Sequence, residues 1–357
     1  MIGTVSLWAH FEDQIAQLKE IKDLSAIVIL GEMEFYYDKI AISTECLAQV
    51  VNYSFQKKVP LYFVTGLSFK DSNFIKPDSE LFKKYEIEYW PTFWFSYSFA
   101  RMNRDYIKPF NDELEVYLDK ETVYKDYKHT FLSMFNMPHI HRCKLIDMFA
   151  KHGLINDNKI SWRMSSGYIF DYWKETRLII DQPEAENIPI GLKREQVPNC
   201  YKDCFMQVVT ESDGIDKHTI SMSTTVPLFF NKPFLTLGKH HYMEYLESFG
   251  FVRYDEIFDY SFDKIEDVGE RAEALALEIK RIDSQRKNWN KMYNQIYDKL
   301  IYNKKKAISI AIDYAKFPDM WMKVAKQDYF PEQHNAELYP IFFLAYIKKL
   351  HEKYKLG

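Results

Sequence analysis

The sequence lacks most features of secreted and membrane-spanning proteins. Only four of its 357 residues are cysteine, too few for a disulfide framework in a chain of this length. No run of about 18 or more uncharged apolar residues occurs, and residues 1–13 lack the basic head and apolar stretch of a signal peptide. We therefore expect a soluble, cytoplasmic protein without a membrane span, whose cysteines are reduced thiols.

The cysteines also provide little support for a metal site. Cys200 and Cys204 are separated by three residues, and no second pair completes the four ligands that structural zinc requires. Cys46 and Cys143 stand alone in the sequence. We expect no bound metal.

Charge is unevenly distributed along the chain. Residues 277–357 contain 16 Lys/Arg against 9 Asp/Glu, about +7, whereas residues 1–276 contain 31 against 42, about −11. Lysines with interleaved acids are typical of a solvated helix face. A surface that binds a polyanion is the alternative interpretation.

Short apolar runs alternate with helical patterns in the first half of the chain. Ser25 to Leu30 and Val59 to Thr65 are rich in β-branched residues and predict buried strands of a parallel sheet, with an amphipathic helix at 40–56 between them. Residues 89–96 are a further strand candidate, which Pro91 weakens.

The second half repeats this alternation. Strands are predicted at 131–135, 205–210 and 233–237, and helices at 141–152, 242–249 and over the long stretch 266–306. The pattern indicates an α/β protein with two Rossmann-like domains, 1–125 and 126–315. Terminal helices at 316–357 could cross back onto the first domain.

Two groups of motifs in the second half carry a family resemblance. The first comprises Phe131 to Asn136, His139-Ile140-His141-Arg142 and Ile160-Ser161-Trp162; the second comprises Lys232-Pro233-Phe234, Gly250-Phe251 and Phe258 to Asp263. In order and spacing they resemble the viral and phage GT-B-like glycosyltransferases. The resemblance implies two Rossmann-like domains facing a cleft. It also implies a nucleoside-diphosphate sugar, expected to be a UDP-sugar, as co-substrate, with no other cofactor.

The chain departs from this family at two places. Relatives carry Thr-Glu-Lys-Thr before the proline that aligns with Pro227, whereas this chain has Ser221-Met222-Ser223-Thr224. Met137 stands where relatives tend to have a basic residue. These changes affect the expected donor contacts, so a degenerate protein that binds a nucleotide or glycan without catalysis is an alternative.

Candidate donor-binding residues follow the predicted strands. By the resemblance, Arg142 contacts the diphosphate and Lys144 assists, since a guanidinium at a helix start suits a phosphate; an arginine that caps a surface helix is the alternative. Ser223, Thr224 and Thr225 precede Pro227, where we expect a helix to begin, so they could contact phosphate or act as N-caps. Glu211 ends a strand, where doubly wound folds place a ribose-binding carboxylate, although an exposed loop glutamate is equally compatible.

The general base is expected from the first domain. The chain contains no Asp-x-Asp, the motif with which single-domain (GT-A) glycosyltransferases hold a divalent ion, so we expect a metal-independent mechanism. Strand ends open into clefts in α/β sheets, which makes His10 with Asp13, Glu32 and Glu34 candidates. A surface or core role is the alternative for each.

Two classes of acceptor remain open. The resemblance implies a viral or surface glycan and, for a viral protein, action in the host cytoplasm. Hydroxymethylated phage DNA is the alternative, with basic residues that grip phosphates, although the pI of about 6.2 argues against it. His240 and His241 could touch a sugar or phosphate, but paired loop histidines more commonly do neither. The DNA-contacting candidates are Lys280, Arg281, Arg286, Lys287, Lys304 and Lys305.

Overall fold

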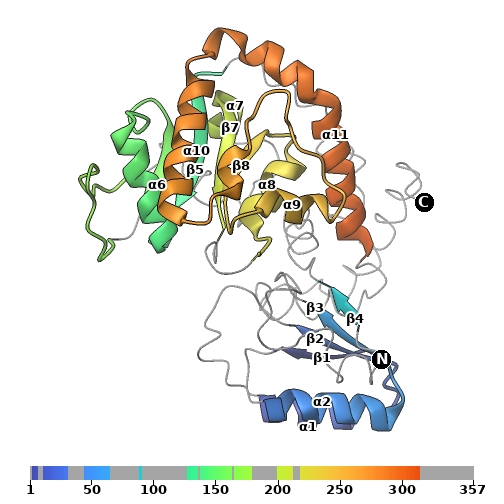
Figure 1. Cartoon of the computed structure of the whole chain (residues 1–357). Helices are drawn as coiled ribbons and strands as arrows, with labels where there is room; N and C mark the ends of the chain where they lie inside the picture. Colours follow the sequence, from blue (N-terminus) through green and yellow to red (C-terminus); the bar gives the residue numbers. More distant parts are fainter. Residues whose placement is uncertain are drawn as a thin grey trace. The chain divides into compact units, whose positions relative to one another are not determined.

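A computed structural model shows a chain of two compact units (Figure 1). One unit contains residues 1–97, 107–110 and 309–357, and the other contains 98–106 and 111–308. The structure describes residues 2–6, 11–30, 44–64, 88–90, 127–135, 137–162, 165–178, 199–211 and 218–313. The terminal helices expected at 316–357 lie outside these described residues.

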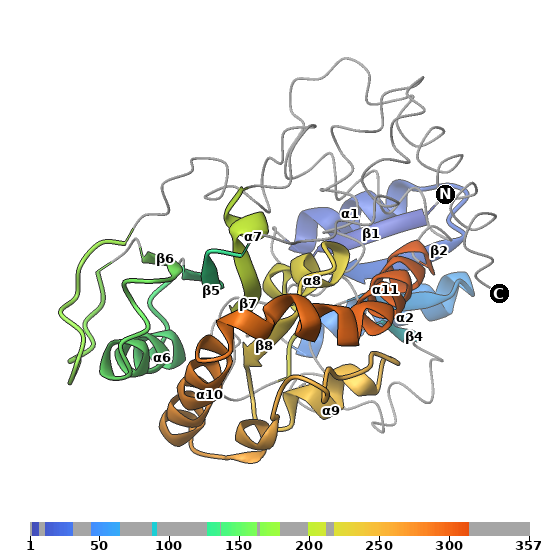
Figure 2. The ribbon, with the colours of Figure 1, turned by 90° about the horizontal axis from the view of Figure 1, so that it is seen from above.

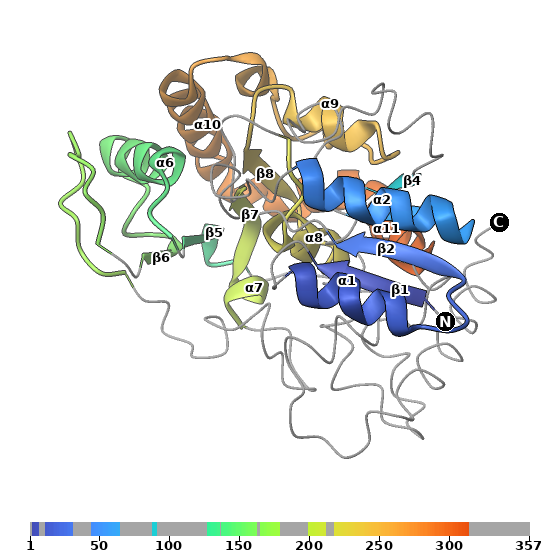
Figure 3. The same ribbon diagram turned by 90° about the horizontal axis from the view of Figure 1, so that it is seen from below.

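The first unit is built on a parallel sheet of four strands in chain order: β1 (Ile2–Ser6), β2 (Ala26–Leu30), β3 (Leu61–Val64) and β4 (Glu88–Trp90). Two helices, α1 (Phe11–Glu20) and α2 (Thr44–Lys57), lie side by side on one face of it (Figures 1 and 3). The Tyr53 hydroxyl of α2 donates to the Leu18 carbonyl of α1 at 3.3 Å. Successive right-handed crossovers place both helices on this face.

The predictions for the first unit are largely confirmed. The runs at 25–30 and 59–65 form β2 and β3, and the amphipathic pattern at 40–56 forms α2. Ile27 and Ile29 of β2 are almost fully buried, as expected for an inner strand of a parallel sheet. Of the strand predicted at 89–96, only Tyr89 and Trp90 are described, and they belong to β4.

The second unit contains a second parallel sheet, with strand order β6-β5-β7-β8. The chain places β6 on one side of β5 and then returns to place β7 on the other, so the winding reverses between β5 and β7. In open α/β sheets, this switch point at the carboxyl ends of the strands is where ligands bind. The strands are β5 (His129–Phe135), β6 (Lys159–Trp162), β7 (Cys204–Thr210) and β8 (Phe234–Leu237).

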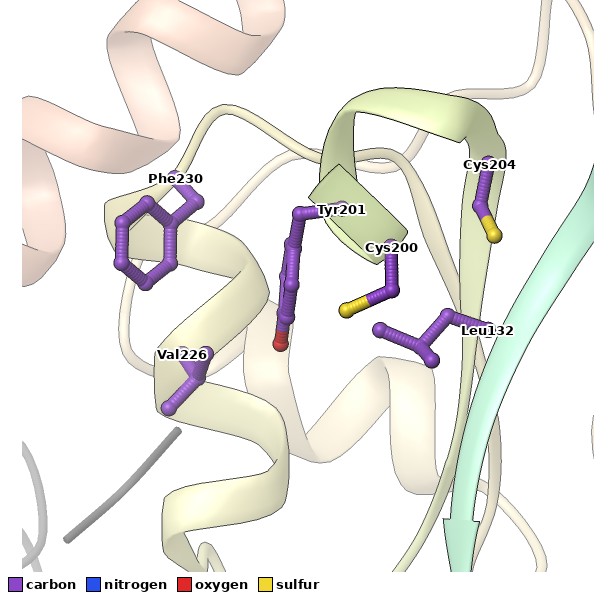
Figure 4. Packing of buried hydrophobic residues seen from close by; sticks show 6 residues of the cluster. All are labelled: Leu132, Cys200, Tyr201, Cys204, Val226 and Phe230. Atoms are coloured by element: carbon purple, nitrogen blue, oxygen red, sulfur yellow. The ribbon is translucent and has the colours of Figure 1, made fainter. Parts of the chain in front are cut away.

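Alternate residues of β5 show that helices cover both faces of this sheet. The Phe131 ring packs against Phe149 of α6 (Ile140–Lys151), with centroids 4.8 Å apart. Leu132 points to the opposite face, into a buried cluster with Tyr201 and Val226 (Figure 4). Those partners belong to α7 (Asn199–Asp203) and α8 (Met222–Phe229). Because both faces are covered, every residue of β7 and β8 is buried.

After β8 the chain forms α9 (Tyr242–Glu247), η4 (Ser261–Lys264), α10 (Val268–Asp283), η5 (Arg286–Asn288) and α11 (Trp289–Asp313). The helix α10 packs along α6 (Figure 2). The helical stretch expected at 266–306 is thus two helices with a break at η5. At this break Trp289 stacks on Phe205, with centroids 5.4 Å apart, and its indole N–H donates to the Ile282 carbonyl at 3.0 Å.

The described residues establish an α/β protein with parallel sheets and flanking helices. Within this part of the chain, no helix combines the length and apolar character needed to cross a membrane.

Candidate functional site

The candidate site lies at the carboxyl edge of the second unit's sheet, where α6 begins. Its N-cap residue, His139, has an extended backbone, and its side chain forms no capping hydrogen bond. The first turn, Ile140 to Cys143, contains no acidic residue. The partial positive charge of the helix start is therefore not offset by an acid within that turn.

Arg142 crosses the switch point between β5 and β7. Its Nε donates to the Thr210 hydroxyl at 3.0 Å, and Nη2 donates to the Thr210 carbonyl at 3.4 Å. Nη1 donates to the Met137 carbonyl at 3.1 Å. The side chain is almost fully buried, so these acceptors hold the guanidinium in a defined orientation at the end of β7.

A second hydrogen bond from α6 reaches the residue that follows β7. His141 Nε2 donates to the Glu211 carbonyl at 2.7 Å, and the His139 and His141 rings stack with centroids 5.7 Å apart. Burial, followed by the nearby Arg142 charge, lowers the pKa of His141 to about 3. The imidazole is therefore neutral at neutral pH.

Glu211 joins the starts of two further helices. Its side chain is fully buried, with Oε2 accepting from the Ser221 amide at 3.0 Å and Oε1 accepting from the Tyr242 hydroxyl at 2.8 Å. The Thr224 hydroxyl also donates to Oε1. Both carboxylate oxygens thus bond to protein groups, and the expected contact with a ribose stays a prediction.

The helix expected to begin near Pro227 begins earlier, at Met222, and that prediction was wrong. Ser221 is the N-cap, and its hydroxyl accepts from the Ser223 amide at 3.1 Å. Pro227 lies inside α8. The Ser221 cap and the Glu211 contacts position the helix start, and together they outweigh the preference of proline for a first turn. Thr224 and Thr225 are fully buried, whereas Ser223 is half-buried.

The turn from β8 to α9 completes the edge. His241 has a left-handed backbone with φ 61°, and its amide donates to the Asp263 carbonyl at 2.7 Å. The Asp263 carboxylate accepts from the amides of Tyr242 at 3.1 Å and Met243 at 2.9 Å. Asp263 therefore holds His241 and the first two residues of α9 in place.

The other candidate donor and base residues lie elsewhere or outside the described residues. The Lys144 ammonium lies at the start of α10, where a Cβ added to Gly269 would meet its Nζ at 3.3 Å. Asp13 is exposed on α1 of the first unit. His10, Glu32 and Glu34 lie outside the described residues.

The candidate DNA-contacting residues do not form a uniform exposed stripe. Lys304 is buried, which lowers its pKa to about 8. Arg281 and Arg286 form ion pairs with Glu278 and Asp283, each at 2.6 Å. The exposed ammonium groups belong to Lys280, Lys287 and Lys305.

Three residues of this edge were not predicted from the sequence: Thr210, Tyr242 and Asp263. Thr210 directly precedes Glu211 and ends the strand predicted at 205–210, so its position could have been predicted from the sequence. Asp263 ends the resemblance motif at 258–263, but the sequence indicates no role for it, because a cap provided from a distant segment leaves no local pattern. Among the described residues, no group of three His, Cys, Asp or Glu side chains is placed to hold a metal ion.

Cys143, Cys200 and Cys204 are buried free thiols. Burial raises the pKa of Cys200 to about 12, so its thiol is protonated at neutral pH.

Comparison with protein-family models, curated proteins and solved structures gives no match to this chain.

Proposed function

We propose that the chain is a glycosyltransferase of GT-B type that binds a nucleoside-diphosphate sugar at the carboxyl edge of the second unit's sheet. The observation that carries the proposal is the position of Arg142. This arginine is oriented by Thr210 across the switch point, at the start of α6. The position matches the role that the family resemblance implies for it.

The chemistry of sugar transfer suits this arrangement. As the bond between the anomeric carbon and the diphosphate oxygen breaks, negative charge builds on the leaving diphosphate, and the acceptor oxygen bonds to the anomeric carbon. A guanidinium and helix-start amides stabilise such charge. A base removes the proton of the acceptor hydroxyl, and its candidates remain His10, Asp13, Glu32 and Glu34.

A UDP-sugar and a viral or surface glycan are the donor and acceptor that we propose. Arg281 and Arg286 are exposed but each pairs with an acid, and Lys304 is buried, so part of the positive charge that the sequence offers to DNA is neutralised or buried. The changed residues at Ser221 to Thr224 motivate binding without turnover as the second candidate.

The proposal is tested by mass spectrometry of transfer products. The full chain is incubated with a mixture of UDP-, GDP- and CMP-sugars, with glycan acceptors in one arm and hydroxymethylcytosine DNA in the other. Glycosylated glycan is the expected product. Glycosylated DNA would show that DNA, and not a glycan, is the acceptor. Donor binding without any product would support binding without turnover. Neither binding nor product would contradict both candidate functions.

A further inference from the structure

Five of the ten histidines of the chain lie in segments that follow strands of the second unit's sheet, at its carboxyl edge. The segment after β5 contributes two, the segment after β7 one, and the turn after β8 two: His139, His141, His218, His240 and His241. Several are in direct contact. His218 Nε2 donates to the His240 carbonyl at 2.9 Å, and the His240 and His241 rings meet edge to face at 5.3 Å.

Positively charged groups lie near two of these rings. Burial and then Arg142 lower the pKa of His139 to about 4. Burial, followed by His241, Arg271 and Lys239, lowers the pKa of His240, and only Glu266 among its named neighbours acts in the opposite direction. The edge is therefore electropositive around both half-buried rings.

Acidic groups of the same edge are already engaged. The Glu211 carboxylate accepts from α8 and α9, and the Asp263 carboxylate accepts from the first amides of α9. Arg271 donates through Nη1 to the Ile265 and Glu266 carbonyls, while its buried Nε has no hydrogen-bond partner among the described residues. These carboxylates keep their negative charge, and Asp263 and Asp267 offset part of the Arg271 charge. The pKa values of His139 and His240 are nevertheless lowered, first by burial and then by neighbouring cations.

We propose that phosphate groups bind at this edge together with protons, which His139 and His240 take up. This inference rests on the proposed function and adds a pH dependence to ligand binding. His139 and His240 are the two rings concerned because, unlike the equally half-buried His218 and His241, they are not held by a carbonyl or carboxylate oxygen among the described residues. His141 is buried and donates to Glu211, His218 Nε2 donates to His240, and His241 Nδ1 lies 3.0 Å from a Glu244 oxygen.

The physical basis is linkage between proton and anion binding. In the free protein, burial and then the neighbouring cations disfavour protonation of both rings. A bound phosphate introduces negative charge that favours the imidazolium form and so raises both pKa values. Because the complex then holds more protons than the free protein, affinity increases as pH falls toward the raised pKa values.

Isothermal titration calorimetry tests the inference directly. UDP-glucose, GDP-fucose and CMP-sialic acid are titrated into the full chain in buffers of different ionisation enthalpy, since their phosphodiester groups stay ionised near neutral pH. At about pH 6.5 we expect uptake on the order of half a proton per ligand, falling toward zero at about pH 8.

Substitutions assign the protons. His139→Gln and His240→Gln should each reduce the uptake, whereas His152→Gln, at the opposite end of α6, should leave it unchanged; thermal unfolding checks that each variant folds. Two outcomes would overturn the inference but not the proposed function. One is ligand binding without proton uptake at either pH, and the other is proton uptake that neither substitution reduces. No binding of any of the three ligands overturns the proposed function as well.

Discussion

Arg142 Nε lies 3.0 Å from the Thr210 hydroxyl oxygen, and this hydrogen bond joins the start of α6 to the carboxyl end of β7. The two residues are 68 positions apart in the sequence. The bond spans the point where the sheet reverses its winding, so it orients a guanidinium at the place where α/β sheets receive their ligands.

The Thr210 hydroxyl is therefore expected to matter for ligand binding. Thr210→Val keeps the side-chain shape but removes the acceptor, which should weaken nucleotide-sugar binding by about tenfold and cost about 1 kcal/mol of unfolding free energy. Thr210→Ser keeps the hydroxyl and should bind as the wild type does. Calorimetric affinities of the two variants make the comparison, and equal affinities would contradict this role.

The turn after β8 should not tolerate a side chain at Gly238. A Cβ there would meet the Tyr242 ring at 2.6 Å, so Gly238→Ala requires the ring to move. We expect a loss of about 1–3 kcal/mol in unfolding free energy. Gly167→Ala is the control, because an added Cβ there meets nothing within 4 Å. Urea unfolding of both variants provides the measurement, and equal midpoints would show that the packing at Gly238 is relaxed.

The Tyr242 hydroxyl is expected to stabilise the edge through Glu211. Tyr242→Phe removes a donor at 2.8 Å from a fully buried carboxylate, which should cost about 1–3 kcal/mol. Tyr302→Phe, at an exposed tyrosine of α11, should change stability by less than about 0.5 kcal/mol. Chemical denaturation distinguishes them. A neutral effect of Tyr242→Phe would mean that Thr224 and Ser221 alone satisfy Glu211.

Lys232 should make stability depend on pH. Its Nζ donates to the Cys204 carbonyl at 2.6 Å, and burial lowers the pKa of this lysine to about 7. Between this pKa and the ordinary value of 10.5, the unfolded chain holds a proton that the folded chain lacks. The lysine contribution therefore makes the unfolding free energy rise with pH between these two pKa values. Below the folded-state pKa the lysine is charged in the folded protein as well, so the full cost of burying the charge applies.

Lys232→Met removes this contribution. Despite the lost bond to Cys204, the variant should be more stable than the wild type at about pH 6, and the difference should shrink or reverse toward about pH 9. Denaturant unfolding at a series of pH values follows the difference. A constant difference across the series would show that the lysine titrates normally in the folded protein.

Local sequence patterns predicted the inner strands and their helices. The short, continuous apolar runs of β2, β3, β5 and β7 are typical of buried parallel strands, and the apolar residues of α6 have helical spacing. β1 and α1 were missed. The position of α8 was wrong, because Pro227 suggests a helix start while the determinants, Ser221 and the distant Glu211, act through tertiary contacts.

The candidate site could be predicted only in part, because several of its residues are brought together by tertiary contacts. Arg142 was identified through the family resemblance, and its position beside Glu211 follows from strand ends that meet at one edge. Asp263 and Tyr242 act from segments that follow β8, and no local spacing links them to Glu211. Lys144 follows Arg142 by two positions, yet the helical period turns it toward α10.

The measurement that tests the central claim most directly compares sugar-transfer rates of Arg142→Lys and Lys144→Ala with the wild type, each shown by thermal unfolding to be folded. Lysine keeps the positive charge but loses the planar fork that Thr210 and Met137 orient. We predict that Arg142→Lys lowers kcat/KM about 100-fold and that Lys144→Ala changes it less than about threefold. An unchanged rate in folded Arg142→Lys would contradict the proposed donor site.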